Sequence, residues 1–210
     1  MILQALVEYY RALERQGKIC APGWSPAKVS YALFIGADGT LRQVTSVQTE
    51  QPRGKKMVLA PQVMHLPSPV KRTMGVAANF LCDNSSYLLG ADAKDRPERT
   101  GQCFKASKAL HERVLQGTDC AAARAVLAFF RTWEPQDARK NPALAQCLQD
   151  VLSGANLVFR TEEGYVHNDP AVRRAWDTYY GAAGDGPRGI CLVTGERELL
   201  ENVHPAIKNV

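Results

Sequence analysis

The pattern of apolar and polar positions predicts a helix followed by a small antiparallel sheet at the start of the chain. Apolar residues recur at helical spacing over residues 1–16, and Gly17 is a typical helix stop. Runs rich in apolar and β-branched residues then predict strands over 28–35 and 41–49. Asp38-Gly39 lies between them, and this pair tolerates the positive φ of a tight hairpin turn. These two strands are therefore expected to form a hairpin.

The next part of the chain has weaker patterns. A third strand is predicted over residues 56–63, where Pro61 indicates an edge strand or a bulge. Residues 66–75 contain two prolines and a glycine, which favour a shaped loop. Residues 86–89 are expected to form a short strand, and 90–100 a charged turn region.

Helical spacing dominates the middle of the chain, and the tail is mixed. Helices are predicted over 104–115, from a cap at Asp119 to Trp133, and over 142–152. The buried face of the second includes Phe129, Phe130 and Trp133. The tail adds strands at 157–159, 165–166 and 190–193, and a helix from Asp169-Pro170 to Gly181, followed by a glycine-rich loop. The whole pattern indicates an α+β fold.

At 210 residues the chain has room for one large domain or two small ones. We expect a single domain over 1–210, with a β-rich part at 1–100 and a helix-rich part at 101–210 as the alternative division.

Charge is segregated along this chain. Residues 39–82 hold six bases and one acid, Glu50, whereas the rest of the chain holds twenty bases and twenty acids. The whole net charge of +5 therefore lies in this segment. Such segregation is expected of a surface that meets phosphate, although a solvated basic face without a partner is nearly as common.

The sequence lacks the features of membrane proteins, of secreted proteins and of several enzyme classes. No apolar run is long enough to span a bilayer, and the N-terminus does not read as a signal peptide, so we expect a cytoplasmic protein without a membrane partner. The six cysteines are far apart and without a CxxC pair, which favours reduced thiols over a zinc site. The four histidines occur singly, and no phosphate-binding loop or nucleophile elbow is present. We predict no cofactor, no metal and no catalytic residue.

One enzymatic alternative is a Mg²⁺-dependent nuclease that uses a carboxylate cluster. Its acids would be Asp83, Asp92, Asp95 and Glu98. Basic residues are interleaved with these acids, which favours a solvated loop of mixed charge over a metal site.

A second route to nucleic acid is a cationic loop with an amide reader. Lys71, Arg72 and Thr73 lie shortly before Asn79, and Asn84 follows. Cations hold phosphates, whereas an asparagine presents a donor and an acceptor to a base edge. A side chain that caps its own loop is an equally good explanation of Asn79. Phe80 is expected to anchor the loop in the core rather than to stack on a base.

Four blocks of sequence carry a family resemblance. They are Met1-Ile2-Leu3-Gln4-Ala5-Leu6 with Tyr9-Tyr10, the run from Asn79 to Gly90 (NFLCDNSSYLLG), Cys191-Leu192-Val193-Thr194-Gly195-Glu196, and His204-Pro205-Ala206-Ile207-Lys208. In this order they resemble the large subunit of Cascade, the type I-C CRISPR surveillance complex, a Csd-type protein. Members of that family are roughly three times as long, so the resemblance implies the N-terminal domain of a longer protein, either an engineered fragment or a natural truncation.

The resemblance implies a non-enzymatic role in RNA-guided antiviral defence. The domain would recognise the protospacer-adjacent motif (PAM) in double-stranded target DNA and help to open the strands beside it, while the guide RNA reads the target. Carried onto this chain, Lys71, Arg72 and Thr73 would contact the PAM duplex, Asn79 and less readily Asn84 would read base edges, and Arg53, Lys55 and Lys56 would hold the backbone.

The resemblance also implies partners. These are the crRNA, the other Cascade subunits and a separate recruited helicase–nuclease that cuts the DNA. An alternative role is an assembly module that contacts the crRNA 5′ handle and neighbouring subunits. From charge alone, an inhibitor that mimics DNA with a carboxylate-rich surface is a further expected partner.

Overall fold

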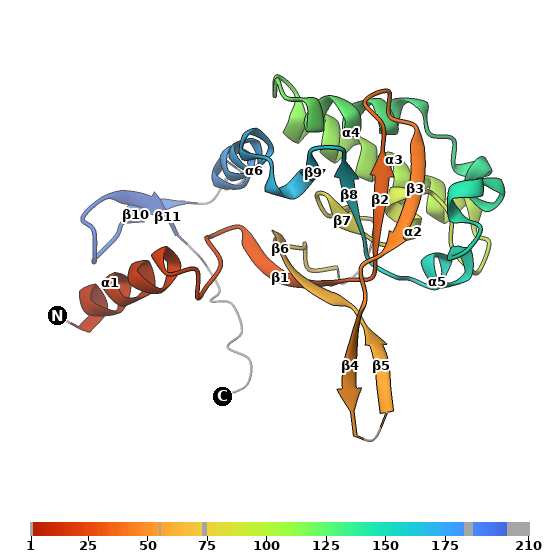
Figure 1. The fold of residues 1–210 in the computed structure, drawn as a ribbon. Coiled ribbons are helices and arrows are strands. Elements are labelled where there is room, and N and C mark those ends of the chain that lie inside the picture. Colours follow the sequence, from red (N-terminus) through yellow and green to blue (C-terminus); the bar gives the residue numbers. More distant parts are fainter. Residues whose placement is uncertain (1, 55, 73–74, 183–186, 201–210) are drawn as a thin grey trace.

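The computed structural model describes residues 2–54, 56–72, 75–182 and 187–200. Within these ranges the fold is α+β: an N-terminal helix, a mixed central sheet, two-stranded ribbons, and helices that follow in sequence (Figure 1). None of the helices in the described ranges has both the length and the apolar character needed to cross a bilayer.

The central sheet has the strand order β3-β2-β8-β7, with β9 paired to β8. β2 pairs antiparallel with β3 and parallel with β8, and β8 pairs antiparallel with β7 and β9. The central strands β2 and β8 are apolar and buried on both faces, as expected for strands covered from two sides. The strands are β2 (Tyr31–Ile35), β3 (Leu41–Ser46), β7 (Cys82–Asp83), β8 (Leu157–Thr161) and β9 (Gly164–Tyr165).

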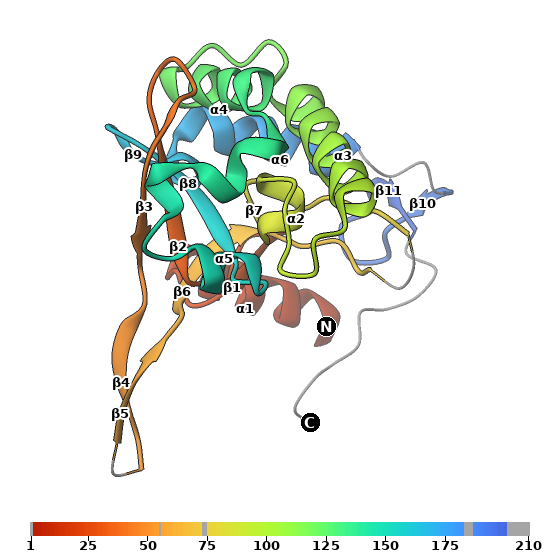
Figure 2. The same ribbon diagram turned by 90° about the vertical axis from the view of Figure 1, so that its right-hand side faces the viewer.

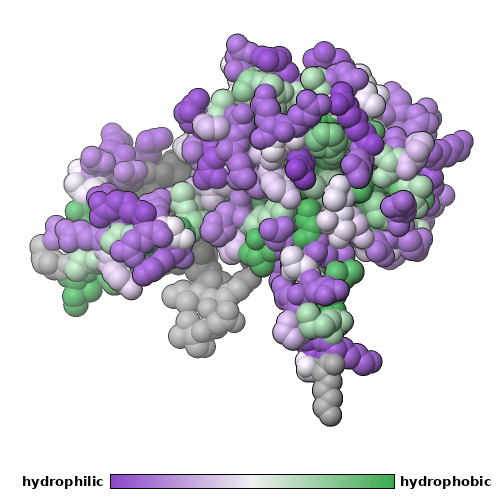
Figure 3. All heavy atoms as spheres, viewed as in Figure 1, coloured by the Kyte–Doolittle hydropathy of each residue, from purple (hydrophilic) through white to green (hydrophobic). Residues whose placement is uncertain are grey.

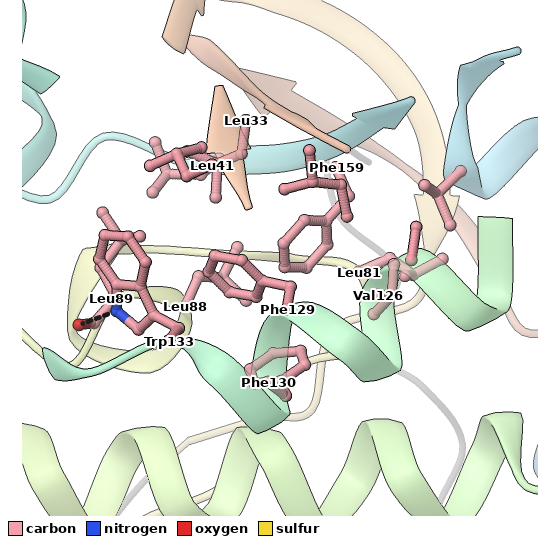
Figure 4. Close-up of a cluster of buried hydrophobic side chains, with 14 of the residues drawn as sticks. Leu33, Leu41, Leu81, Leu88, Leu89, Val126, Phe129, Phe130, Trp133 and Phe159 are labelled. Carbon is pink, nitrogen blue, oxygen red and sulfur yellow. Dashed lines mark hydrogen bonds between the residues drawn. The ribbon is translucent and has the colours of Figure 1, made fainter. Parts of the chain in front are cut away.

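Helices cover one face of this sheet and enclose the main core (Figures 2 and 4). α3 (Pro97–Leu115) packs against α4 (Ala121–Thr132), and α4 contacts β2 and β8. Phe129 of α4 meets Phe159 of β8 edge to face, with ring centroids 5.2 Å apart. Such pairs add about 0.5–1.5 kcal/mol beyond the area that they bury. Near α4's end, Trp133 donates its indole N–H to the carbonyl of Leu89 at 3.0 Å.

A two-stranded ribbon covers the other face of the sheet. β1 (Trp24–Val29) pairs antiparallel with β6 (Gln62–Pro67). Met64 and Leu66 of β6 are buried in a second, smaller apolar cluster with Ala32 of β2 and Val158 of β8. This cluster attaches the ribbon to the body of the protein.

A second hairpin extends away from the body beyond this ribbon (Figures 1 and 2). We call β4 (Thr49–Arg53) and β5 (Lys56–Ala60) the arm. Every residue of β4 is exposed. Gly54, with a φ of 64°, lies in the turn at its tip. Pro61 separates β5 from β6, so the arm and the ribbon are consecutive segments of one long excursion.

The N-terminal helix α1 (Ile2–Arg15) has no buried residue. Ile2, Leu3, Leu6 and Tyr9 of its apolar face are each more than half exposed. Apolar atoms show at this end of the molecule and along the arm in the space-filling view (Figure 3). Beside α1 lies a short hairpin of β10 (Arg188–Ile190) and β11 (Arg197–Leu199), whose turn residue Val193 lines a shallow hollow with α1.

α6 (Pro170–Ala182) ties the body to the start of β1. The indole N–H of Trp176 is donated to the carbonyl of Gly23 at 2.8 Å, and that of Trp24 to Asp177 at 2.7 Å. Arg173 lies over the Trp24 ring, 3.9 Å from its centroid. These contacts fix the direction in which the ribbon leaves the body.

The α+β class and the hairpin at Asp38-Gly39 are confirmed, as are the predicted helices that correspond to α1, α4 and α6. Phe80, Phe129, Phe130 and Trp133 are buried as expected. α3 is longer than predicted, because Pro97 supplies an early N1 position.

Five predictions of local structure are wrong. The strand expected at 28–35 divides at Ser30 between β1 and β2. The expected strand at 86–89 is a helical turn, because Asn84 caps its N-terminus. The helix expected at 142–152 is broken into two short helical segments. The third strand at 56–63 divides at Pro61 into β5 and β6, and the strand at 190–193 ends at Ile190, with Leu192 94% exposed rather than buried. The short elements are α2 (Ser85–Leu88), η1 (Pro135–Lys140), η2 (Pro142–Leu144), α5 (Leu148–Leu152) and η3 (Val166–Asn168).

Candidate nucleic-acid interface

The cationic loop predicted from sequence is the connection from β6 to β7, residues 68–81, which we call the basic loop. No helix or strand forms in the described part of it, so other contacts must hold its shape. Its principal anchor is Asp83, whose side chain is 2% exposed. This carboxylate accepts hydrogen bonds from both terminal nitrogens of Arg72 and from the backbone N–H groups of Asn79 and Asn84, the last two at 2.9 Å.

Arg72 therefore points into the protein. Besides its ion pair with Asp83, it donates from Nε to the carbonyl of Ala77 and lies over the Tyr87 ring, 3.9 Å from the centroid. The sequence suggested that Arg72 is a clamp for phosphate, but the geometry gives it an internal task. We leave Arg72 out of the proposed DNA contacts for this reason.

Lys71, the neighbour of Arg72, is exposed. It forms no ion pair with any part of the chain that the structure describes. Thr73, the third predicted contact of the loop, lies outside the described residues. Lys71 is thus the cation that the basic loop offers to a ligand.

The two asparagines differ in their surroundings. Asn84 caps α2, and its Oδ1 accepts the backbone N–H of Ser86 at 3.0 Å. The Oδ1 of Asn79 accepts the backbone N–H of Val70 at 3.0 Å, which closes the loop on itself. The side-chain NH₂ of half-buried Asn79 has no hydrogen-bond partner within the described ranges, so it keeps a donor for a base edge.

The arm presents a second cationic group. Arg53 and Lys56 are exposed and lie directly opposite each other at the end of the β4–β5 ladder. Like charges in this position repel each other and destabilise a hairpin. Neither forms an ion pair among the described residues. Lys55, the third predicted backbone contact, lies outside them.

The other face of the arm is mainly apolar, with one acid, Glu50, opposite Leu59. Met57 and Leu59 of β5 share this face, and they are 58% and 64% exposed. Pro52 lies opposite Met57 on the neighbouring strand. The arm therefore combines a cationic face with an apolar one, at a site where solvent reaches both.

Three of the four carboxylates of the nuclease alternative are paired with an arginine, and Glu98 forms no ion pair within the described ranges. Asp83 pairs with Arg72, Asp92 with Arg96, and Asp95 with Arg139. The hydrogen bonds and charge of Arg96 outweigh burial and keep the pKa of Asp92 below its ordinary value. Over the described ranges, no three acids, histidines or cysteines come together as metal ligands.

The cysteines are unpaired and the two buried histidines are uncharged. All six cysteines are free thiols. Burial lowers the pKa of His111 to about 4, and burial with the charge of Arg173 does the same for His167. Both imidazoles are therefore neutral at physiological pH.

Sequence reasoning missed the part that Asp83 and Tyr87 play in shaping the loop. Asp83 lies one residue beyond the acid-poor segment 39–82, and this position was a usable indication that the segment has a counter-charge at its border. The contact of Tyr87 with Arg72 depends on the fold of α2, which the sequence pattern did not predict.

Comparison with known protein families places this chain among CRISPR-associated proteins. The model of the family Cas_Csd1, described as a CRISPR-associated protein, matches residues 6–210. The chain therefore belongs to the Cas_Csd1 family, in agreement with the resemblance drawn from its four sequence blocks. A search of curated proteins found no matching relative.

Proposed function

We propose that this domain binds double-stranded DNA in a CRISPR effector complex of type I-C and recognises the protospacer-adjacent motif. The observation that carries the proposal is the pair of opposed cations, Arg53 and Lys56, at the tip of the arm. Two like charges held face to face are relieved when an anion lies between them, and a DNA phosphate is such an anion.

Lys71 supports the same proposal from a different element. Between Lys56 and Pro67 the chain is two consecutive strands, which span at most about 36 Å at ~3.3 Å per residue. One turn of duplex DNA is about 34 Å. The tip of the arm therefore lies no farther than about one turn of duplex from the start of the basic loop, so a single duplex is long enough to contact both. In this arrangement the cations set the register, and Asn79 offers its amide donor to a base.

The apolar face of the arm supports a part in strand opening. Apolar side chains that enter a base step unstack it, and methionine, leucine and proline are among those that do so. Met57, Leu59 and Pro52 lie next to the cationic tip. The cationic face of the arm would first bind phosphates, and its apolar face would then open the strands.

Duplex binding with variants tests the proposal. Lys71→Glu should weaken binding to all duplexes and reduce the slope of log K against log salt by about 0.9 for the lost phosphate contact. Asn79→Ala should leave that slope unchanged and lower the preference for one short sequence, at a cost of about 1–3 kcal/mol. Equal binding of all sequences by the wild type, or unchanged binding by both variants, would refute the proposal.

A second candidate function is assembly, and α1 favours it. The apolar face of this helix is exposed, and exposed apolar patches typically mark protein interfaces. As an assembly module, the domain would contact neighbouring subunits and the crRNA 5′ handle. Leu6→Glu should then block incorporation of the domain into the complex without changing DNA binding. Added handle RNA should displace the domain from the complex, and added duplex DNA should not.

A further inference from the structure

Asp83 is the most highly connected side chain of the candidate site. A carboxylate only accepts hydrogen bonds, and four donors occupy the two oxygens of this one. With 2% of its side chain exposed, it has almost no contact with solvent and cannot itself be a DNA contact. Its effect on a ligand must pass through its four donors.

These donors lie at well-separated points of the chain. Arg72 is in the middle of the basic loop, Asn79 is near its end, and Asn84 starts α2. Tyr87 of α2 lies under the guanidinium of Arg72, and its hydroxyl oxygen accepts the N–H of Ala77. One buried charge thus ties both sides of the loop to the body of the protein.

The orientation of Asn79 follows from this arrangement. Asp83 fixes its backbone, and the N–H of Val70 fixes its side-chain oxygen. The amide NH₂ therefore has a set direction before any ligand binds. The ion pair between Arg72 and Asp83 likewise fixes the backbone next to Arg72, which carries the exposed Lys71.

We propose that Asp83 is the positioning residue of the DNA-reading loop and determines its sequence discrimination without touching DNA. The inference rests on the proposed function of duplex recognition. Loss of the carboxylate charge frees Arg72, the loop takes several shapes, and Asn79 no longer meets a base edge in one orientation. General attraction to phosphate persists, because Lys71, Arg53 and Lys56 are untouched.

The test compares Asp83→Asn with Asp92→Asn in the full chain. Asp92 is a matched control, since it is also buried and paired with an arginine, but in the segment before α3. Each variant is incubated with a library of DNA duplexes in which a short stretch of base pairs is randomised. The duplexes that bind are then sequenced. Asp83→Asn should reduce the enrichment of preferred sequences by about tenfold, the equivalent of one lost base contact, with a salt slope no smaller than that of the wild type. Asp92→Asn should behave like the wild type.

Trypsin gives a readout that needs no DNA. The pair with Asp83 protects the bond after Arg72, so Asp83→Asn should be cut there faster than the wild type and than Asp92→Asn. The inference would be overturned if Asp83→Asn enriched the preferred sequences as the wild type does and resisted trypsin at Arg72 equally well. The proposed function would then remain in place. A wild-type chain that enriches no sequence would overturn the proposed function, and the inference with it.

Discussion

The imidazole of His111 accepts the backbone N–H of Leu81 at 3.0 Å, and Leu81 is held in the left-handed conformation with a φ of 59°. The other ring nitrogen, Nδ1, lies 2.7 Å from the carbonyl of Ser107, to which it donates its proton. The neutral imidazole thus stabilises a strained backbone position next to the basic loop. The Phe80 ring lies nearby, tilted by 38° to the imidazole, with the two ring centroids 5.0 Å apart.

This contact predicts a dependence of stability on pH. Burial lowers the pKa of His111 from 6.5 to about 4, so the unfolded chain binds more protons between these values. The free energy of unfolding should therefore fall as the pH drops from 6.5 towards 4, by about 3 kcal/mol for this group. His111→Gln removes the titrating group. The difference in free energy of unfolding between the wild type and this variant, measured by urea titration, should therefore become smaller as the pH falls from 6.5 towards 4. A gap that is constant with pH would contradict the prediction, and the comparison cancels the similar contribution of His167.

Arg72 and Asp83 should be strongly coupled in stability. Arg72→Met leaves a buried carboxylate without its counter-charge and should cost about 3 kcal/mol. Adding Asp83→Asn removes the charge as well, so the double variant should regain most of the loss. Urea unfolding of the two single variants and the double variant measures the coupling energy. Simple addition of the two single effects would mean that the pair is not a unit.

Gly39 should tolerate no side chain. Its φ is 84°, and a Cβ there would lie 2.3 Å from the backbone nitrogen of Phe129 in α4. Gly39→Ala should therefore destabilise the protein by more than about 3 kcal/mol, since strain and overlap add. Gly117 is the matched control, because it has a φ of 77° and nothing within 4 Å of the added atom. Gly117→Ala should cost only about 1–2 kcal/mol, for the backbone alone.

The arm should contribute to the salt dependence of DNA binding. Arg53→Gln and Lys56→Gln should each lower the slope of log K against log salt by up to about 0.9. The same changes should raise the thermal stability of the hairpin slightly, because the opposed charges are removed. Lys105→Gln on exposed α3 surface serves as the control for loss of a charge elsewhere. Equal slopes for all three variants would show that the arm is not a phosphate contact.

Local patterns in the sequence were sufficient for the long helices and for the β2–β3 hairpin. The spacing of apolar residues predicts α1, α4 and α6, and Asp38-Gly39 predicts the turn. The ribbon was missed because residues 28–35, rich in apolar and β-branched side chains, fit one continuous strand pattern. In the structure the run divides at Ser30, whose N–H is donated to the carbonyl of Asn156, so β1 leaves the sheet that β2 joins. The boundary between β1 and β2 thus depends on Asn156, a residue distant in sequence, and a local pattern cannot predict it.

For the candidate site, the sequence indicated the charged segment but not the direction of its side chains. Arg72 and Lys71 are neighbours with the same charge, yet Arg72 is paired with the buried Asp83 and Lys71 forms no ion pair among the described residues. The difference comes from the buried position of Asp83 beside β8, which is a property of the sheet. Asn84, the less favoured of the two predicted base readers, caps α2 in the structure.

The N-terminal helix has a thermodynamic consequence. Since none of its side chains is buried against the rest of the protein, its folding is weakly coupled to that of the body. On heating, or in hydrogen exchange, its amides should open well before those of β2 and β8, in a separate step of low cooperativity. The chain is therefore expected to melt as two units of very different size, with the small one released first.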